Sequence, residues 1–291
     1  MEKLMAYSQV GINDVDILIE NPNWDMQQKV DGIRARLVVS GNDVYVIGST
    51  GGDLVSTTAA PVTERLMALG NHTARNTPGV EFELEGEIIG EKFWVFDMPM
   101  NSRASVNHYT VWSKRQLCMK EFVWSLGAVG QATGKDWGWL SLLPVISGAE
   151  KKAAFWKDIQ EVGAEGAIFK HRDSTVEDGR RVDHVLKVKI THTIDCFVIE
   201  RGPGNGRNGA GNWLSLGLYK KDGSVYEAGR CSFIGKPVAH AGEVIELRYL
   251  YAGAGGRLVQ PTHLRNRPDK NPEDCTTEQL HFVSKKVLLY F

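Results

Sequence analysis

Short stretches that alternate apolar and polar residues, each followed by a turn signal, recur along most of this 291-residue chain. Alternate residues of a strand point to the same face, so this pattern predicts half-buried β-strands. The alternation runs over Met26–Val39 and resumes over Val44–Ile47 after a turn signal at residues 40–43, which predicts a β-hairpin with Lys29 near its start. The same pattern predicts further strands at Val80–Ile89 and Lys92–Met98.

Helices are expected between these strands. Apolar residues recur with helical spacing in three segments. One begins with a proline, and another begins with a serine that can cap a helix. The predicted helices are Pro61–Leu69, Ser113–Val129 and Ala149–Val162, and the remaining strands of this part are Leu140–Ile146, Glu165–His171 and Val185–Ile190.

The pattern changes after Ile190. Short strand-like pieces now alternate with glycine-rich turns such as GPGNGRNGAGN, which is typical of a small β-barrel. We therefore predict an α+β chain with a domain boundary near residue 190. Residues 1–190 form antiparallel sheets with flanking helices, and residues 191–291 form a β-barrel.

Composition excludes several classes of protein. The formal net charge of −1 excludes a globally basic nucleic-acid binder. From Thr191 onward the chain has 13 Lys+Arg and 10 Asp+Glu, an excess that fits phosphate contacts and fits a random scatter of surface charge equally well. No apolar run could span a bilayer, the N-terminus lacks a signal-peptide region, and the four cysteines form no CxxC pair. We expect a protein of the cytoplasm without disulfide bonds.

The segment Lys29-Val30-Asp31-Gly32-Ile33-Arg34 has residue types suited to chemistry on a phosphate. An uncharged lysine amine is an effective nucleophile. Gly32 allows a sharp turn or close approach to a ligand, and the guanidinium of Arg34 matches the geometry of a phosphate. Alone, the segment is equally compatible with a surface strand of mixed charge.

Paired charges on other predicted strands complement this segment. Lys187 and Lys189 lie on one strand face, where an anion such as a polyphosphate would relieve their repulsion. Glu87, together with Glu165 further along the chain, suits a divalent cation, since Mg²⁺ commonly takes one or two protein carboxylates plus phosphate oxygens. Phe96 could stack on a base, although aromatic residues on strands are also ordinary packing residues.

The ordered set KVDGIR, LEGEI, FWVFD, EGAIFK and LKVK resembles motifs I, III, IIIa, IV and V of the covalent nucleotidyltransferases, most closely those of ATP-dependent DNA ligases. A later RNRPDK segment resembles motif VI, so the resemblance spans nearly the whole chain. It implies a nucleotidyltransferase (adenylation) domain over residues 1–190 and an OB-fold DNA-binding domain over residues 191–291. It also implies ATP, Mg²⁺ or Mn²⁺, and nicked double-stranded DNA as ligands. The expected setting is a monomer in a bacterial or virus-infected cell, without distinction between replication, repair and recombination.

The resemblance also implies a role for each matching residue. Lys29 would attack the α-phosphate of ATP and become adenylated, Asp31 would place the metal or the 3′ end, and Arg34 would contact the nick phosphate. The remaining expected nucleotide contacts are Gln27, Glu87, Phe96, Lys187, Lys189, Arg267 and Lys270, with Asp269 beside them and with Glu87 and Glu165 as the metal ligands. The expected DNA contacts are Arg103, Arg115, Arg201, Arg207 and Arg248, for which a solvated surface role is an equal alternative.

The chain departs from the ligase pattern at one segment. Where the family usually has an arginine in motif Ia, this chain has Gly48-Ser49-Thr50-Gly51-Gly52, and Arg36 or Arg75 are the candidates to replace it. The chain also has no room for the DNA-encircling domain of larger ligases. Three alternatives stay open: an mRNA-capping guanylyltransferase, an RNA ligase, and a non-catalytic nick-binding OB protein.

Overall fold

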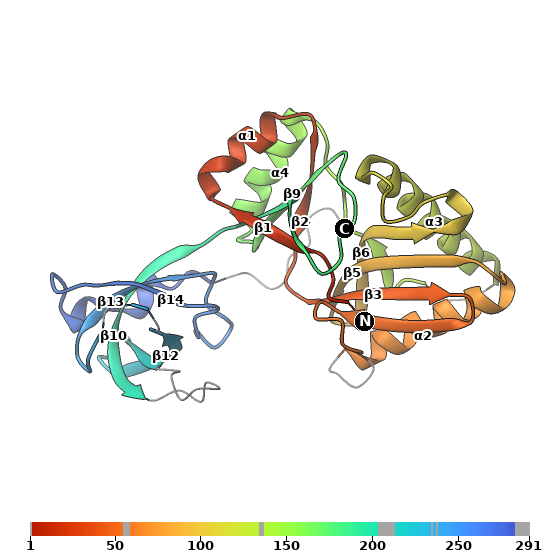
Figure 1. Cartoon of the computed structure of the whole chain (residues 1–291). Coiled ribbons are helices and arrows are strands. Elements are labelled where there is room, and N and C mark those ends of the chain that lie inside the picture. Colours follow the sequence, from red (N-terminus) through yellow and green to blue (C-terminus); the bar gives the residue numbers. More distant parts are fainter. Residues whose placement is uncertain are drawn as a thin grey trace. The chain divides into compact units, whose positions relative to one another are not determined.

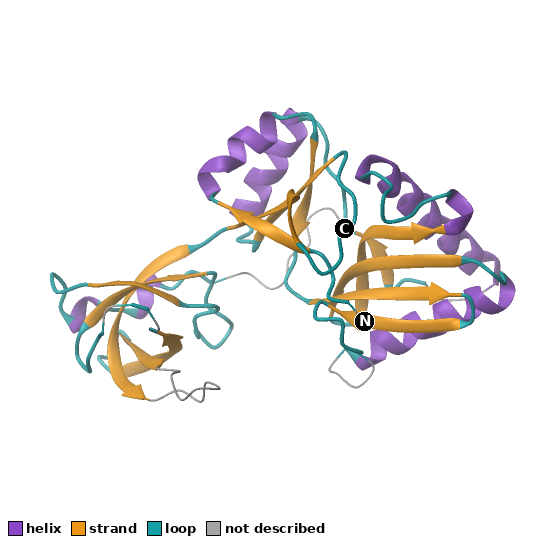
Figure 2. Cartoon of the chain, viewed as in Figure 1, coloured by secondary structure: helices purple, strands orange, loops and turns teal. Residues whose placement is uncertain are grey.

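The computed structural model describes residues 2–54, 59–133, 137–202, 213–233, 235–236 and 238–282, without the side chains of residues 128–133. The chain divides into two compact units (Figure 1). The first unit includes Met1–Glu161 and Glu165–Val188, and the second includes Val162–Ala164 and Lys189–Val287. Strands dominate both units, and the helices gather in the first (Figure 2).

A four-stranded sheet, here called sheet A, forms one half of the first unit. Its strands are β1 (Ala6–Val10), β9 (Arg181–Lys189), β8 (Gly166–His171) and β2 (Trp24–Lys29), in that order. The helices α1 (Val15–Glu20) and α4 (Ala149–Glu161) pack together beside it (Figure 1). Lys152 joins these helices, because its buried ammonium donates to the carbonyl oxygens of Leu18, Asn21 and Trp24 at 2.9, 2.8 and 2.9 Å. Those carbonyls lie at and beyond the end of α1, where a helix has no partners of its own for them.

A five-stranded sheet, here called sheet B, forms the other half of the first unit. Its order is β4 (Asp43–Gly48), β3 (Ile33–Ser40), β5 (Glu81–Ile89), β6 (Lys92–Asn101) and β7 (Leu140–Leu142). The helices α2 (Ala60–Asn76) and α3 (Trp112–Thr133) cover one face (Figure 1). The alternating residues of β3 and β5, including Leu37 and Leu84, bury their side chains in the core under these helices. The other face of the sheet is therefore available for polar side chains.

The prediction that Lys29 begins a β-hairpin is wrong. β2 pairs with β8 in sheet A, whereas β3 pairs with β4 and β5 in sheet B. The chain crosses from one sheet to the other at residues 30–32, so Lys29 ends its strand at the crossing. Gly32 permits the crossing, because a Cβ at this position would lie 2.4 Å from the carbonyl oxygen of Ile88.

The second unit is built on an antiparallel sheet, here called sheet C. Its order is β12 (Val225–Ser232), β11 (Trp213–Tyr219), β10 (His192–Gly202), β13 (Val244–Tyr249) and β14 (Thr262–Asn266). Its core is formed by aliphatic and cysteine side chains such as Leu216, Cys196 and Ile245. Among the described residues the sheet is open, with β12 and β14 as its edges, so the predicted closure into a barrel is not seen.

Short 3-10 helices complete the fold. They span Ile12–Asp14, Ser102–Ala104, Pro272–Asp274 and Thr277–Gln279. None of the helices in the described part of the chain has the length and apolarity needed to cross a bilayer. The predicted combination of sheets and helices is confirmed. The sheets of the first unit are not purely antiparallel as predicted, because β1 pairs with β9 and β6 pairs with β7 in parallel.

Candidate active site

A cavity of about 240 Å³ lies in the first unit, lined by strands of both of its sheets. Sheet A contributes β1, β2, β8 and β9, and sheet B contributes β3, β5 and β6. The lining residues are Ala6, Tyr7, Gln27, Gln28, Lys29, Val30, Arg34, Glu87, Phe96, Leu143, Ile168, Lys170 and Lys187. The cavity therefore brings together the predicted residues Gln27, Lys29, Arg34, Glu87, Phe96 and Lys187.

Lys29 is held at the cavity by a carboxylate. Its Nζ donates to Oε2 of Glu165 at 2.6 Å, and the side chains are 20% and 6% exposed, respectively. This contact follows from the strand register, because Lys29 pairs with Gly166 at the end of the β2–β8 ladder, next to Glu165. The predicted nucleophile and one predicted metal ligand are thus direct partners.

Glu87 lies opposite on β5, and its ionisation is suppressed. Burial raises the pKa of Glu87 from 4.5 to about 7; Lys29 and Arg34 oppose this shift, while Glu165 and Asp31 add to it. The crossing after Lys29 lies close to this side chain, since a Cβ at Gly32 would come within 2.8 Å of the Glu87 Cγ. Glu165 and Asp31 therefore lie close enough to Glu87 to disfavour its charged form.

The raised pKa of Glu87 predicts a pH-dependent stability. The folded state holds a proton on Glu87 between pH 4.5 and about 7 that the unfolded chain has lost, so folding becomes less favourable as pH rises through this window. Relative to a Glu87→Gln variant, the wild type should lose on the order of 2–3 kcal/mol from pH 4.5 to 7 and no more above it. Urea denaturation of both proteins at intervals of pH measures the difference. A difference that stays constant across the window would contradict the assignment.

Arg34 and Arg36 on β3 share one buried carboxylate, that of Glu85 on β5. Arg34 Nε donates to Oε1 of Glu85 at 2.6 Å, and Arg36 Nη2 donates to Oε2 at 2.6 Å. Burial acts to raise the pKa of Glu85, but the two guanidinium groups outweigh it and lower the pKa. Arg36 also donates to both carboxylate oxygens of Asp178, with Nη2 at 2.9 Å from Oδ1.

Arg36 does not replace the arginine that is missing from motif Ia. This side chain is 2% exposed and fully engaged by Glu83, Glu85 and Asp178, so it faces the interior. The other candidate, Arg75, is exposed in the last turn of α2. The structure therefore rules out Arg36 as a substrate contact.

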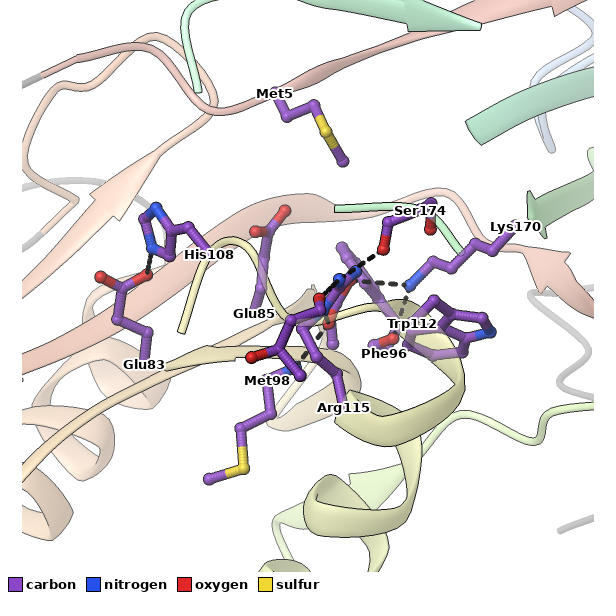
Figure 3. A network of polar contacts seen from close by, with 12 residues as sticks. Met5, Glu83, Glu85, Phe96, Met98, His108, Trp112, Arg115, Lys170 and Ser174 are labelled. Atoms are coloured by element: carbon purple, nitrogen blue, oxygen red, sulfur yellow. Dashed lines mark hydrogen bonds and ion pairs between the residues drawn. The ribbon is translucent and has the colours of Figure 1, made fainter. Parts of the chain in front are cut away.

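Beneath Phe96 lies a buried group of charges that sequence reasoning did not identify. Lys170 donates to the carbonyl oxygen of Phe96 at 2.7 Å and to Oδ2 of Asp97 at 3.3 Å (Figure 3). Its ammonium lies 3.9 Å from the ring centroid of Trp112 and 5.0 Å from that of Phe96. Burial lowers the pKa of Lys170 to about 8, although Asp97 opposes the shift. Phe96 thus lines the cavity and also packs against Lys170, while its stacking on a base stays a prediction.

The prediction that Arg115 binds DNA is wrong. Its side chain is 0% exposed, with Nε and Nη2 donating to the two oxygens of Asp97 at 2.9 and 3.0 Å. Nη1 donates to the carbonyl oxygens of Thr110 and Ser174 (Figure 3). Although burial opposes it, Arg115 and Lys170 hold the pKa of Asp97 well below its usual range. Arg115 therefore joins elements of the first unit and is inaccessible to DNA.

The remaining predicted nucleotide contacts occupy different places. Gln27 is buried on β2 and donates through Nε2 to the carbonyl oxygen of Leu143 at 3.2 Å. Lys187 on β9 lines the cavity, whereas Lys189 is absent from its lining and donates to Oε1 of Gln260 at 3.1 Å. The two lysines therefore have different surroundings: Lys187 lines the cavity, and Lys189 binds Gln260.

The RNRPDK segment begins in the last two residues of β14 in the second unit, and ion pairs hold its side chains. Arg267 donates through Nη1 to Oδ1 of Asp195 at 3.1 Å and through Nη2 to Oδ2 of Asp269 at 2.8 Å. Lys270 lies 3.3 Å from Oδ2 of Asp195. Hydrogen bonding from Arg267 lowers the pKa of Asp269 to about 2.

Three predicted DNA contacts are exposed and one cannot be described. Arg103 follows β6, Arg201 lies on β10 with its guanidinium carbon 4.9 Å from the ring centroid of Phe233, and Arg248 lies on β13. Arg207 lies outside the described residues. The exposed side chains of these three arginines are available to a ligand.

The described residues include no group of three or more His, Cys, Asp or Glu side chains arranged to hold a metal ion. Mg²⁺ does not require one, because it usually keeps water and takes one or two carboxylates plus substrate phosphate. Glu165 lies close enough to Glu87 to act on its pKa, so these are two neighbouring carboxyl groups that could take an ion together. The residues present thus fit a magnesium ion that binds together with a phosphate.

The comparison with known families identifies the chain. The model of the family described as RNA ligase matches residues 23–189, more than half of the sequence. The matched range holds Lys29, Glu87, Phe96, Glu165 and Lys187. The chain belongs to the RNA ligase family, and its resemblance to covalent nucleotidyltransferases is confirmed.

Solved structures share the fold at low sequence identity. A structure titled Pmar-Lig_PreS3 is 15% identical, with a TM-score of 0.67, over 91% of this chain and 67% of that chain. A Lig E DNA ligase is 18% identical, with a TM-score of 0.58, over 92% of this chain and all of that chain. The ligase domain of LigD from M. tuberculosis is 20% identical, with a TM-score of 0.48, over 94% of this chain and 98% of that chain. A comparison with curated protein sequences gives no match.

Proposed function

We propose that this protein is an ATP-dependent DNA ligase, which seals nicks between 5′-phosphate and 3′-hydroxyl ends in duplex DNA. The observation that carries the proposal is the position of Lys29, held by Glu165 at a cavity that Glu87, Phe96 and Lys187 also line. A lysine amine fixed beside groups suited to a nucleotide is the arrangement that covalent catalysis requires. The fold shared with a Lig E DNA ligase, over the whole length of that chain, is in keeping with it.

In the first step, Nζ of Lys29 would attack the α-phosphorus of ATP. A P–N bond forms, the bond to the β-phosphate oxygen breaks, and pyrophosphate leaves. Lys187, which lines the cavity, would neutralise charge on the α-phosphate, while Phe96 and Gln27 would bind the base. Lys189 is the second proposed lysine, and it would have to exchange its contact with Gln260 for the phosphate. Fixed charges of this kind act without reorganisation as the transition state forms.

In the later steps, AMP would move from Lys29 to the 5′-phosphate of the nick, and the 3′-hydroxyl would displace it. Arg34 would contact the nick phosphate, and Asp31, at the exposed crossing between the sheets, would place the 3′ end. Glu87 and Glu165 would hold Mg²⁺, or Mn²⁺, which supplies electrostatic stabilisation of phosphate oxygens.

We propose that the second unit is an OB-type DNA-binding domain. Its five antiparallel strands begin to curl at one edge, where Leu258 N donates to the carbonyl oxygen of Ala228 on β12 at 2.8 Å. Arg267, Asp269 and Lys270 would orient the leaving pyrophosphate. Arg201 and Arg248 of this unit, Arg103 of the first, and Arg207 are the proposed DNA contacts.

An RNA ligase is the second candidate, because the matching family carries that description. Both enzymes would take AMP from ATP, whereas a capping enzyme would take GMP from GTP. A nicked duplex with DNA on all three strands, compared with the same duplex carrying RNA at the broken strand, separates the two ligases. We expect sealing of the DNA nick at a rate at least about tenfold higher, since a duplex-DNA site discriminates by helix geometry and the 2′-hydroxyl. Faster sealing of the RNA strand would replace the first candidate by the second.

Joining should also fall steeply with salt. Lysine and arginine contacts to phosphate release counterions, so a protein with 6–10 such contacts loses roughly 10³–10⁵ in affinity between 50 and 200 mM salt. Sealing measured at limiting protein over that range tests the DNA-binding role of the exposed arginines. A flat response would count against duplex DNA as the substrate. The monomeric state and the cytoplasmic location stay predictions, open to light scattering and cell fractionation.

A further inference from the structure

Tyr7 lies at the site, although it belongs to none of the sequence motifs. It lies on β1, the first strand of the chain, and lines the same cavity as Lys29. Its hydroxyl accepts a hydrogen bond from Nη2 of Arg34 at 3.0 Å. The guanidinium carbon of Arg34 also lies 4.5 Å from the centroid of the Tyr7 ring, which is cation–π range.

All three nitrogens of the Arg34 guanidinium have partners. Nε donates to Glu85 at 2.6 Å, Nη1 donates to the carbonyl oxygen of Met5 at 2.8 Å, and Nη2 pairs with Glu85 as well as with Tyr7. Met5 is itself fixed, because its backbone N–H donates to Oδ1 of Asp178 at 3.1 Å. The segment that carries Met5 and Tyr7 thus ties β3 of sheet B to the β1 edge of sheet A.

The ion pairs around Arg34 are unevenly distributed. Arg36 pairs with Glu83 and Asp178 as well as with Glu85, whereas Arg34 pairs with Glu85, which it shares with Arg36. Tyr7 adds no charge, because burial raises the pKa of its phenol and keeps it protonated. A phosphate oxygen forms a stronger hydrogen bond to a guanidinium than a neutral phenol does.

We propose that Tyr7 is a positioning residue, which fixes the direction of the Arg34 guanidinium for the phosphate of the nick. The inference rests on the proposed function. An arginine side chain has many rotamers, and restraining it before the substrate arrives lowers the entropic cost of binding. Both the hydroxyl and the ring of Tyr7 supply this restraint.

The sealing step tests the proposal in isolation. With a nicked duplex that already carries AMP on its 5′-phosphate, the 3′-hydroxyl attacks the phosphorus, a P–O bond forms, and AMP leaves without any need for ATP. Single-turnover sealing is measured for the wild type, Tyr7→Phe, Arg34→Ala and the double variant. Tyr45→Phe, a partly buried tyrosine of β4, is the matched control.

Tyr7→Phe keeps the ring and loses the hydroxyl, so we expect sealing to slow by about tenfold. In the Arg34→Ala background the same change should alter the rate by less than about twofold, because the group it positions is gone. Equal losses in both backgrounds would mean that Tyr7 acts through general structure and would overturn the proposal, as would wild-type rates in Tyr7→Phe. Failure of the wild type itself to seal the adenylated nick would overturn the proposed function instead.

Discussion

Replacing Lys29 with arginine should abolish the transfer of label from α-³²P-ATP to the protein. Arginine keeps a positive charge opposite Glu165, whose side chain is 6% exposed, so the ion pair and the fold are preserved. A guanidinium is protonated at any pH at which the protein is folded, so it offers no lone pair for attack on phosphorus. We expect labelling to fall by more than about a thousandfold.

A control variant shows whether the loss of labelling is specific to Lys29 or follows from replacing any lysine with arginine. Lys157 on α4 is 75% exposed and paired with Glu161 one turn away, so Lys157→Arg should label at the wild-type rate. Denaturing gels of both variants, run beside the wild type after a short incubation with ATP, make the comparison. Labelled Lys29→Arg would assign the nucleophile elsewhere.

Replacing Asp97 with asparagine should destabilise the fold by about 3–5 kcal/mol. The carboxylate is buried between Arg115 and Lys170, which are themselves inaccessible to water. Asparagine preserves the volume but leaves two buried cations without their counter-charge. Urea denaturation at pH 7 gives the change in the free energy of unfolding.

The expected loss is specific to the buried network. Glu64→Gln, an exposed carboxylate of α2, should change the free energy of unfolding by less than about 0.5 kcal/mol. A loss below about 1 kcal/mol for Asp97→Asn would show that the network contributes little. Because Lys170 binds both Asp97 and the backbone of Phe96, a large loss would also show that this network supports the wall of the cavity.

Much of the site could be predicted from the sequence because short motifs carry its residues. Lys29, Glu87, Phe96 and Lys187 come from separate segments, and the cavity brings them together. The strands that carry them alternate clearly. β5 begins one residue after its predicted start, and β6 begins at its predicted start. Local pattern was sufficient where each strand continued in one sheet.

Long-range pairing was not available from local pattern. The alternation over residues 26–39 is nearly continuous, so it did not reveal that β2 and β3 belong to different sheets. β1, α1 and β14 were missed, since their segments are short and have weak periodicity. Because β1 was missed, Tyr7 was missed as a site residue. Its contact with Arg34 joins residues 27 positions apart.

The sequence around Arg115 contains a pattern that predicts burial of this side chain. Arg115 lies three residues after Trp112 and four before Met119, both fully buried, so helical spacing places all three on the inner face of α3. The assumption that an arginine on a helix is solvated outweighed this pattern. Its partner Asp97, at the end of FWVFD, could be recognised only from the structure.

The most direct test of the central claim is a single-turnover chase with adenylated protein. The protein is labelled with ATP, freed of nucleotide and mixed with nicked duplex DNA, and peptide mass spectrometry locates the AMP before and after mixing. We predict AMP on Lys29 at the start, and its release together with sealed DNA and no added ATP. AMP on another residue, or AMP that stays on the protein while the nick remains open, would contradict the account.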